Sequence, residues 1–227
     1  MKKFLYVLLM LPMFLFAGCS NNNLFNLAKN NIAEARYNLY VGETENLKVM
    51  LTSGIRESDY VINGYCSDPC DFGVLTFNFK TQITLPETVN YVLTVGTVRF
   101  DGVLEQNPYD GSYVCDVKTI VNSSDVVSAK IIAGEFVESV ELTCVNQNWN
   151  VDYIKALNLA CDELNQKIST FIENDQFLGE CYIKILNDDE LGANCYYWYV
   201  NFVSRKGENY ACIIDPISNE IMAKKEL

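Results

Sequence analysis

In the middle of the chain, apolar and polar residues alternate in short runs, which indicates β-strands. Three runs with a period of two are Leu47–Leu51, Val74–Phe79 and Tyr91–Val95, and β-branched and aromatic residues are frequent in them. Turn signals such as Asn63-Gly64 separate the runs. We therefore expect about eight short antiparallel strands over residues 37–147, arranged as an all-β sandwich or barrel.

Two later runs in this stretch predict a hairpin. Ala129–Ala133 and Phe136–Val145 flank the dipeptide Gly134-Glu135. A glycine between two strand-like runs is typical of a tight turn.

At Asn150 the spacing of the apolar residues changes from every second residue to every third or fourth residue. The apolar residues that follow this spacing are Ile154, Leu157, Ala160, Cys161, Leu164, Ile168, Phe171 and Ile172. They predict an amphipathic helix of about six turns, with Asn150 as its N-cap and its end near Asn174-Asp175. Four strand-like runs follow, at 180–186, 195–204, 210–215 and 220–224. The fold class is thus α+β: an N-terminal antiparallel β-sandwich followed by a helix packed on a small antiparallel sheet.

The run Cys195–Phe202 carries aromatic residues on both faces of its predicted strand. One face has to cover the long helix. The other face either packs against the first domain or stays exposed, where aromatic side chains on a rigid sheet suit binding of a sugar or a peptide.

The first eighteen residues have the organisation of an export signal. Lys2 and Lys3 precede an apolar run, Phe4–Gly18, which is too short to span a membrane. The run ends in Ala17-Gly18, directly before Cys19. This arrangement resembles the lipobox of bacterial lipoproteins, although Phe16 stands where the family usually has Leu.

The resemblance implies that residues 1–18 are removed and that Cys19 carries fatty acids such as palmitate. The protein would then be anchored in the cell membrane and face away from the cytoplasm. The alternative is an ordinary secretory signal after which Cys19 is incidental. We expect residues 19–36 to form a tether with room for a short helix, since Ser20–Asn23 have nothing to bury. The acidic body would be repelled by anionic headgroups and stand away from them.

The last part of the chain, residues 148–227, ends in an aromatic strand, a glycine turn and a closing aspartate before a final strand. The residues in this order are Tyr197, Tyr199, Gly207, Tyr210, Asp215 and Glu220-Ile221. With the helix before them, they are similar to cystatin-like and especially PepSY-type domains. Asn219 takes the place of the family's usual Gly, which it can replace in a left-handed turn. The resemblance implies binding or regulation and brings no catalytic residues.

Composition excludes several kinds of chemistry. The chain has no histidine, which rules out Ser-His-Asp and Cys-His nucleophiles and histidine-containing zinc sites. Its formal net charge of −12 argues against a nucleic-acid partner. No nucleotide-phosphate motif is present, and we expect neither a cofactor nor a metal ion. The acidic run Asn187–Glu190 lacks the spacing of an EF-hand, so a solvated loop is favoured over a calcium site.

Eight cysteines remain beside Cys19, and an exported protein can oxidise them. The closest pair is Cys66 and Cys70, separated by Ser67-Asp68-Pro69, and this proline-bearing turn could bring them within bonding distance. The alternative is that most of the eight are buried thiols, which is favoured for Cys115, Cys144, Cys161, Cys181 and Cys195.

These features predict a lipid-anchored protein of the cell envelope, a non-catalytic binding or structural module with a protein or glycan ligand. One alternative is a carboxylate-dependent envelope hydrolase, which needs two facing acids with at least one raised pKa. Another is a PepSY-like regulator of a secreted protease.

Overall fold

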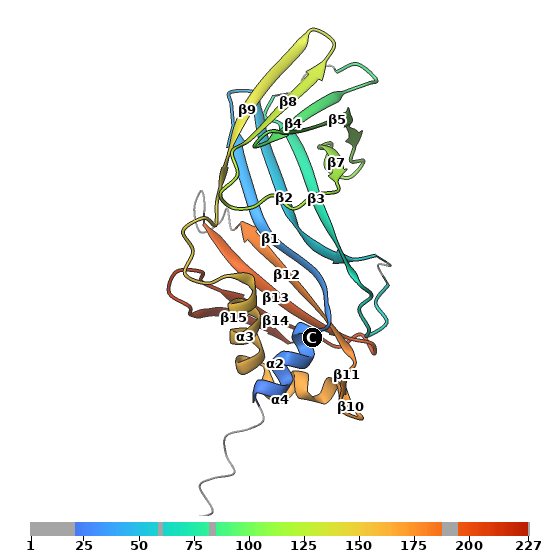
Figure 1. Cartoon of the computed structure of the whole chain (residues 1–227), viewed down its shortest axis with the longest axis vertical. Helices are drawn as coiled ribbons and strands as arrows, with labels where there is room; N and C mark the ends of the chain where they lie inside the picture. The colour runs from blue at the N-terminus through green and yellow to red at the C-terminus, as the bar shows by residue number, and fades with distance from the viewer. Residues whose placement is uncertain (1–20, 59–60, 82–84, 188–194, 227) are drawn as a thin grey trace, which may run out of the picture.

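The chain folds mainly as antiparallel β-structure. A computed structural model describes residues 21–58, 61–81, 85–187 and 195–226 (Figure 1). Strands account for 54% of the part of the chain that the structure describes and helices for 13% of it, and the sheet is nearly closed. The expectation of a β-rich antiparallel fold is therefore confirmed. The predicted signal, residues 1–18, and Cys19 lie outside the described residues.

The strands are β1 (Ile32–Glu43), β2 (Leu47–Glu57), β3 (Pro69–Phe79), β4 (Asn90–Val95), β5 (Val98–Val103), β6 (Glu105–Gln106), β7 (Tyr113–Val117), β8 (Val127–Ala133), β9 (Phe136–Cys144), β10 (Ile172–Glu173), β11 (Gln176–Phe177), β12 (Gly179–Asn187), β13 (Tyr196–Ser204), β14 (Asn209–Ile214) and β15 (Ile221–Glu226). The helices are α2 (Asn21–Lys29), α3 (Tyr153–Glu163), α4 (Asn165–Ile168) and the 3-10 turn η2 (Ser169–Phe171). None of the described helices is long and apolar enough to cross a membrane.

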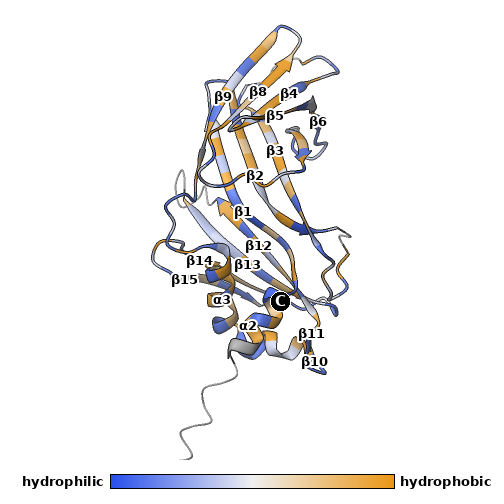
Figure 2. Cartoon of the chain, viewed as in Figure 1, coloured by the Kyte–Doolittle hydropathy of each residue, from blue (hydrophilic) through white to orange (hydrophobic). Residues whose placement is uncertain are grey.

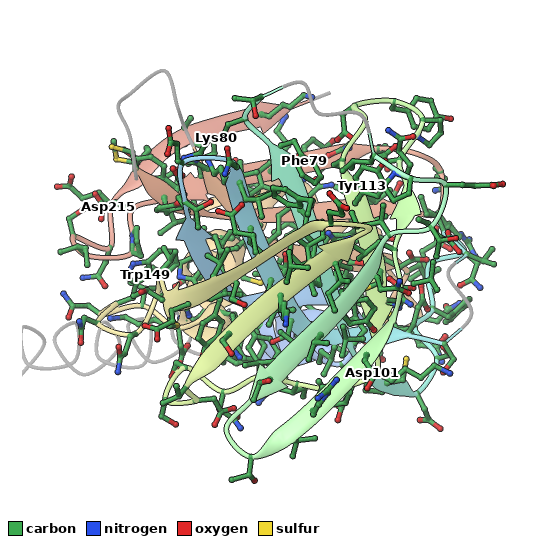
Figure 3. The ribbon with its side chains drawn as sticks, turned by 90° about the horizontal axis from the view of Figure 1, so that it is seen from above. Phe79, Lys80, Asp101, Tyr113, Trp149 and Asp215 are labelled. Atoms are coloured by element: carbon green, nitrogen blue, oxygen red, sulfur yellow. The ribbon has the colours of Figure 1, made fainter. Side chains whose placement is uncertain are left out.

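We call residues 39–51 and 74–145 the upper region, because they surround one hydrophobic core. From β1 the sheet continues through β2, β3, β7 and β6 on one side, and through β9, β8, β4 and β5 on the other. Only Leu104 separates β5 from β6, and its N–H donates to the carbonyl of Val89 at 2.8 Å. The two sides thus almost meet, and side chains fill the space between them when the molecule is seen from above (Figure 3).

β9 meets β1 over two residue pairs, Tyr40 with Cys144 and Val41 with Thr143. Gly42 makes this approach possible, because a Cβ atom there would lie 2.3 Å from the carbonyl oxygen of Glu141. Beyond the pairs, the Asn146 side chain accepts from the N–H of Leu39 at 3.1 Å and donates to the carbonyl of Tyr37 at 2.9 Å. Asn146 therefore prolongs the contact between the two strands with its side chain.

We call residues 21–37, 52–57, 149–187 and 195–226 the lower region, because they surround a second hydrophobic core, against which Ile55 of β2 packs. Here β15, β14, β13 and β12 form an antiparallel sheet, and β12 joins β1 in parallel over Ile32–Arg36. The helices α2 and α3 cover one face of this sheet and bury a second core with it (Figure 1). Strands in both regions alternate between hydrophobic and hydrophilic residues (Figure 2), as one-sided burial requires.

The amphipathic helix is shorter than its apolar spacing predicts. Its N-cap is Asp152 rather than Asn150: the Asp152 carboxylate accepts from the N–H of Lys155 at 2.7 Å. The helix ends at Leu164, whose φ of −99° and ψ of 12° leave the helical range. Residues 165–171 continue as α4 and η2, so their apolar side chains still reach the core through short turns.

The N-terminal part of the described chain also differs from the expectation. Asn21–Asn23 form the first turn of α2, although we expected them to be an extended tether. Residues 32–36, which we expected to belong to a tether with room for a short helix, begin β1. The reason is tertiary: Ala35 is fully buried between β12 and the helices, a contact that local spacing does not reveal.

Candidate functional site

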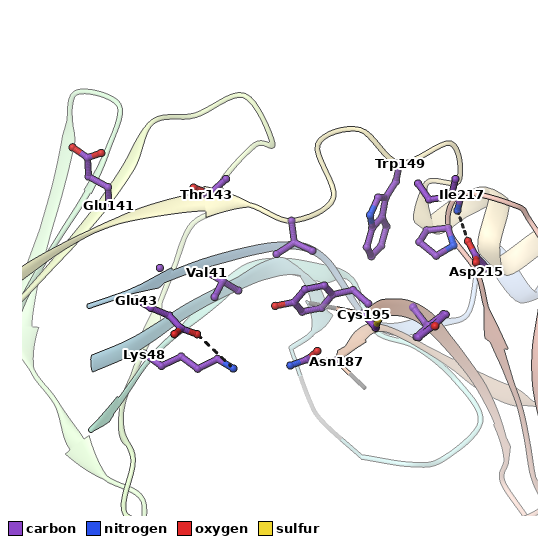
Figure 4. A pocket seen from close by; sticks show the side chains of 15 residues that line it. Val41, Glu43, Lys48, Glu141, Thr143, Trp149, Asn187, Cys195, Asp215 and Ile217 are labelled. Atoms are coloured by element: carbon purple, nitrogen blue, oxygen red, sulfur yellow. Dashed lines mark hydrogen bonds and ion pairs between the residues drawn. The ribbon is translucent and has the colours of Figure 1, made fainter. Parts of the chain in front are cut away.

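A groove of about 860 Å³ lies where the upper and lower regions meet. Five parts of the chain line it: β1 and β2, the end of β9 with the linker to α3, the ends of β12 and β13, and the turn between β14 and β15 (Figure 4). Its lining residues are Val41, Gly42, Glu43, Lys48, Glu141, Thr143, Val145, Trp149, Asn187, Cys195, Tyr196, Tyr197, Asp215, Pro216 and Ile217.

One wall of the groove is aromatic and held in place by the lower core. The Trp149 ring packs edge-on against the buried Trp198, with ring centroids 5.1 Å apart. The indole N–H of Trp198 donates to the carbonyl of Val151 at 2.8 Å, which fixes the linker after Trp149. The backbone N–H groups of Asn150 and Val151 both donate to the carbonyl of Pro216 at 3.1 Å. The linker and the β14–β15 turn are therefore one connected wall.

The turn in this wall is shaped by its own polar side chains. Asp215 accepts from the N–H groups of Ile217 at 2.7 Å and Ser218 at 3.0 Å. Asn219 has a φ of 67°, a left-handed conformation that asparagine tolerates better than most residues. Lys155 of α3 donates to the Asn219 side chain at 2.9 Å, which connects the turn to the helix.

The opposite wall carries charges from the upper region. Glu43 accepts a hydrogen bond from Lys80 at 2.6 Å and lies 4.0 Å from Lys48. The hydrogen bond from Lys80 lowers the pKa of Glu43, so this carboxylate is ionised at neutral pH. A general acid needs a pKa shift in the other direction. Glu141 of β9 lies on the same side of the groove (Figure 4).

The aromatic strand contributes to both the core and the groove. On β13, Trp198, Val200 and Phe202 face the helices, as one face of this strand was expected to do. Tyr199 lies on the other face beneath Lys184, whose ammonium is 5.2 Å from the ring centroid. Tyr196 and Tyr197 line the groove.

Cys66 lies in the loop between β2 and β3 and Cys70 at the beginning of β3, and neither lines the groove. Both are free thiols in the structure, so the disulfide remains a prediction for the oxidised protein. Burial is the main cause that raises the pKa of Cys66 to about 12, with Glu57 and Glu180 as negative neighbours. Glu180 is fully buried and accepts from the N–H groups of Asn63 at 2.6 Å and Gly64 at 2.7 Å, which fixes this loop to β12.

The other described cysteines divide by burial. Cys144, Cys161, Cys181 and Cys212 are buried. This agrees with the expectation of buried thiols for Cys144, Cys161 and Cys181, whereas Cys115 and Cys195, for which burial was also expected, are only half-buried. Among the described residues, no group of three or more Cys, Asp or Glu side chains is placed to hold a metal ion. Of the acidic run, Asn187 lines the groove and residues 188–190 lie outside the described residues.

Sequence reasoning did not find the groove. Trp149 stands in a linker without periodicity, and Gly42 lies inside a strand that the pattern did not mark. The only signal was the aromatic content of residues 195–202. Comparison with protein-family models, with curated proteins and with solved structures gave no match.

Proposed function

We propose that this protein is a lipid-anchored protein of the cell envelope that binds a ligand, without catalysis, in the groove between its two regions. The observation that carries the proposal is the fixed aromatic wall around Trp149, opposite a wall that carries Glu43, Lys48 and Glu141. The anchor is Cys19, on the strength of its lipobox-like context. The proposal includes the fold class expected from the sequence, α+β. A sandwich-like N-terminal half then supplies one wall of the groove, and a C-terminal half with a helix packed on a sheet supplies the other.

An oligosaccharide is the ligand class that suits the groove best. Tryptophan and tyrosine rings offer flat apolar faces for sugar rings, while carboxylates accept hydrogen bonds from hydroxyl groups. Glu43, Glu141 and Asp215 supply the carboxylates, and among the described residues of the lining only Lys48 is basic. An anionic ligand fits poorly, because those acids outnumber the lysine and the chain carries a net charge of −12.

Titration with soluble oligosaccharides tests the proposal. The probes are chitotetraose and cellotetraose, added to the detergent-solubilised full-length protein while the heat of binding is recorded by isothermal titration calorimetry, a signal that does not depend on Trp149. We expect saturable binding of at least one probe, and a Trp149→Ala variant that binds at least about tenfold more weakly because the central aromatic contact is lost. Tyr109→Ala is the matched control, since Tyr109 is 96% exposed and is not part of the groove lining.

Two results would count against the groove as a glycan site. One is that neither probe binds the protein at millimolar concentration. The other is that Trp149→Ala, with an unchanged circular dichroism spectrum, binds as tightly as Tyr109→Ala.

A further inference from the structure

The distance along the chain from the proposed anchor to the folded body is very short. α2 begins at Asn21, so only Ser20 stands between it and Cys19. Two residues span at most about 7 Å when fully extended. The acyl chains of a lipidated Cys19 would therefore hold the beginning of α2 at the level of the lipid headgroups.

α2 cannot swing away from the body to create more distance. Leu24 and Ala28 are buried in the lower core. Directly after the helix, the Asn31 side chain donates to the backbone carbonyl of Phe177 at 2.5 Å. The backbone carbonyl of Asn31 accepts from the N–H of Cys181 at 2.8 Å. Because α2 is fixed to β11 and β12, the part of the body beside its first turn follows the anchor.

We call that part the base: residues 165–178, which form α4, η2 and the β10–β11 hairpin, together with the β13–β14 turn at 204–208. It forms the end of the molecule at which the chain enters α2 (Figure 1). Its outward residues are polar: Gln166, Lys167, Ser169, Thr170, Asn174, Asp175, Gln176 and Lys206 are exposed.

Charge is distributed unevenly between the base and the other end of the molecule. The base carries Lys167, Arg205 and Lys206 against Glu173, Asp175 and Glu208, which balance to zero. Within it, Glu173 accepts from Arg205 at 2.8 Å and from Lys206 at 3.3 Å. Residues 85–145 of the upper region carry three basic and nine acidic residues, a net charge of −6.

We propose that the base rests on the headgroup layer of an anionic bilayer and that the protein stands upright on it. The proposal depends on the lipid anchor of the proposed function. The net charge of the whole body predicted that it stands away from anionic headgroups, but the base is neutral and approaches them without the repulsion that the upper region meets. The exposed Lys167 and Lys206 are the residues of the base that contact the lipid phosphates. Polar side chains at the surface of the base exchange hydrogen bonds with the hydrated headgroups.

Hydrogen–deuterium exchange of the lipidated full-length protein tests the orientation. The protein is reconstituted into vesicles of phosphatidylethanolamine and phosphatidylglycerol, and its exchange is compared with that in detergent. We expect amides in 165–178 and 204–208 to exchange at least about threefold more slowly on the vesicles. Amides of the β8–β9 turn around Gly134 serve as the internal control and should not change.

Two variants sharpen the test. Insertion of ten Gly/Ser residues between Ser20 and Asn21 should abolish the protection, because the body can then leave the surface. Lys206→Glu should reduce the protection, whereas Lys130→Glu on β8, in the upper region, should leave it unchanged.

Fatty-acid labelling of the same samples separates the two proposals. Label on Cys19 without protection of the base overturns the upright contact but leaves the anchor intact. Equal protection in the insertion variant also overturns it. Absence of label overturns the anchor, and the orientation with it.

Discussion

The two regions of the molecule share β1 and β2 but bury their cores in different ways. In the upper region the sheet curves until β5 and β6 link its two sides, and the interior is filled by side chains of the strands and of loops between them, such as Val89, Leu104 and Val121. In the lower region the sheet stays open and helices cover one face. The comparison shows that one pair of long strands, β1 and β2, can belong both to a nearly closed sheet and to an open sheet covered by helices. The groove forms where the nearly closed part of the sheet passes into the open part.

The largest effect is expected where β1 and β2 are packed most closely. A Cβ atom on Gly54 would lie 1.8 Å from the carbonyl oxygen of Ala35. Gly54→Val should therefore separate the strands that both regions share and cost more than about 4 kcal/mol, enough to prevent folding. Circular dichroism and thermal melting measure this. Gly73→Ala is the control: its Cβ meets backbone oxygens at 3.3 Å or more, and a native-like melt is expected.

Matched core truncations test whether the two regions unfold together. Leu157 lies in the lower core and Leu93 in the upper core, and both are fully buried. Each Leu→Ala change should cost about 2–5 kcal/mol. Because β1 and β2 belong to both regions, we expect one cooperative transition, lowered by either variant. Two transitions in calorimetry, each sensitive to only one variant, would show that the regions are independent.

A smaller loss is expected at the contact between β9 and β1. Asn146→Ala removes the side-chain hydrogen bonds to Leu39 and Tyr37 and should destabilise the protein by about 1–3 kcal/mol. Exposed Asn148 in the same linker is the control, and Asn148→Ala should change the free energy of unfolding by less than about 0.5 kcal/mol. Urea denaturation compares the two. Equal stability of both variants would mean that Asn146 does not hold the strands together.

The smallest effect concerns pH. Lys80 lowers the pKa of Glu43 in the folded protein, so the pair stabilises the fold above the unfolded pKa of about 4.3. This contribution is lost as the pH falls through the folded pKa. Because Glu43 is largely exposed, it amounts to a few tenths of a kcal/mol at most. Lys80→Met should reduce stability at pH 7 but not at pH 3, whereas Lys184→Met should not produce this pH-dependent difference.

Sequence patterns predicted the parts of the fold that local contacts determine. The β8–β9 hairpin follows from two alternating runs around Gly134, whose φ of 63° suits the turn. The strands of the lower sheet also lie close to their predicted positions. Each of these elements pairs with its neighbour in the chain, so the sequence pattern and the fold agree there.

Elements that depend on distant partners were missed or misjudged. β1 pairs with β2, β9 and β12, and its first residues fit a helical spacing equally well. The long helix was overestimated because Ile168 and Phe171 keep helical spacing while the backbone turns after Leu164. The groove could not be predicted, because five separate segments form it and Trp149 gains its partner only by tertiary packing.

Both proposals, ligand binding at the cell envelope and the upright contact of the base with the bilayer, depend on the proposed lipid anchor at Cys19. Mass spectrometry of the N-terminal peptide from the membrane fraction of an expressing bacterium tests it most directly. We predict a mature chain that begins at Cys19 and carries thioether-linked diacylglycerol, and a Cys19→Ala variant without lipid. An unprocessed chain that begins at Met1 and is recovered from the cytosol would contradict the account.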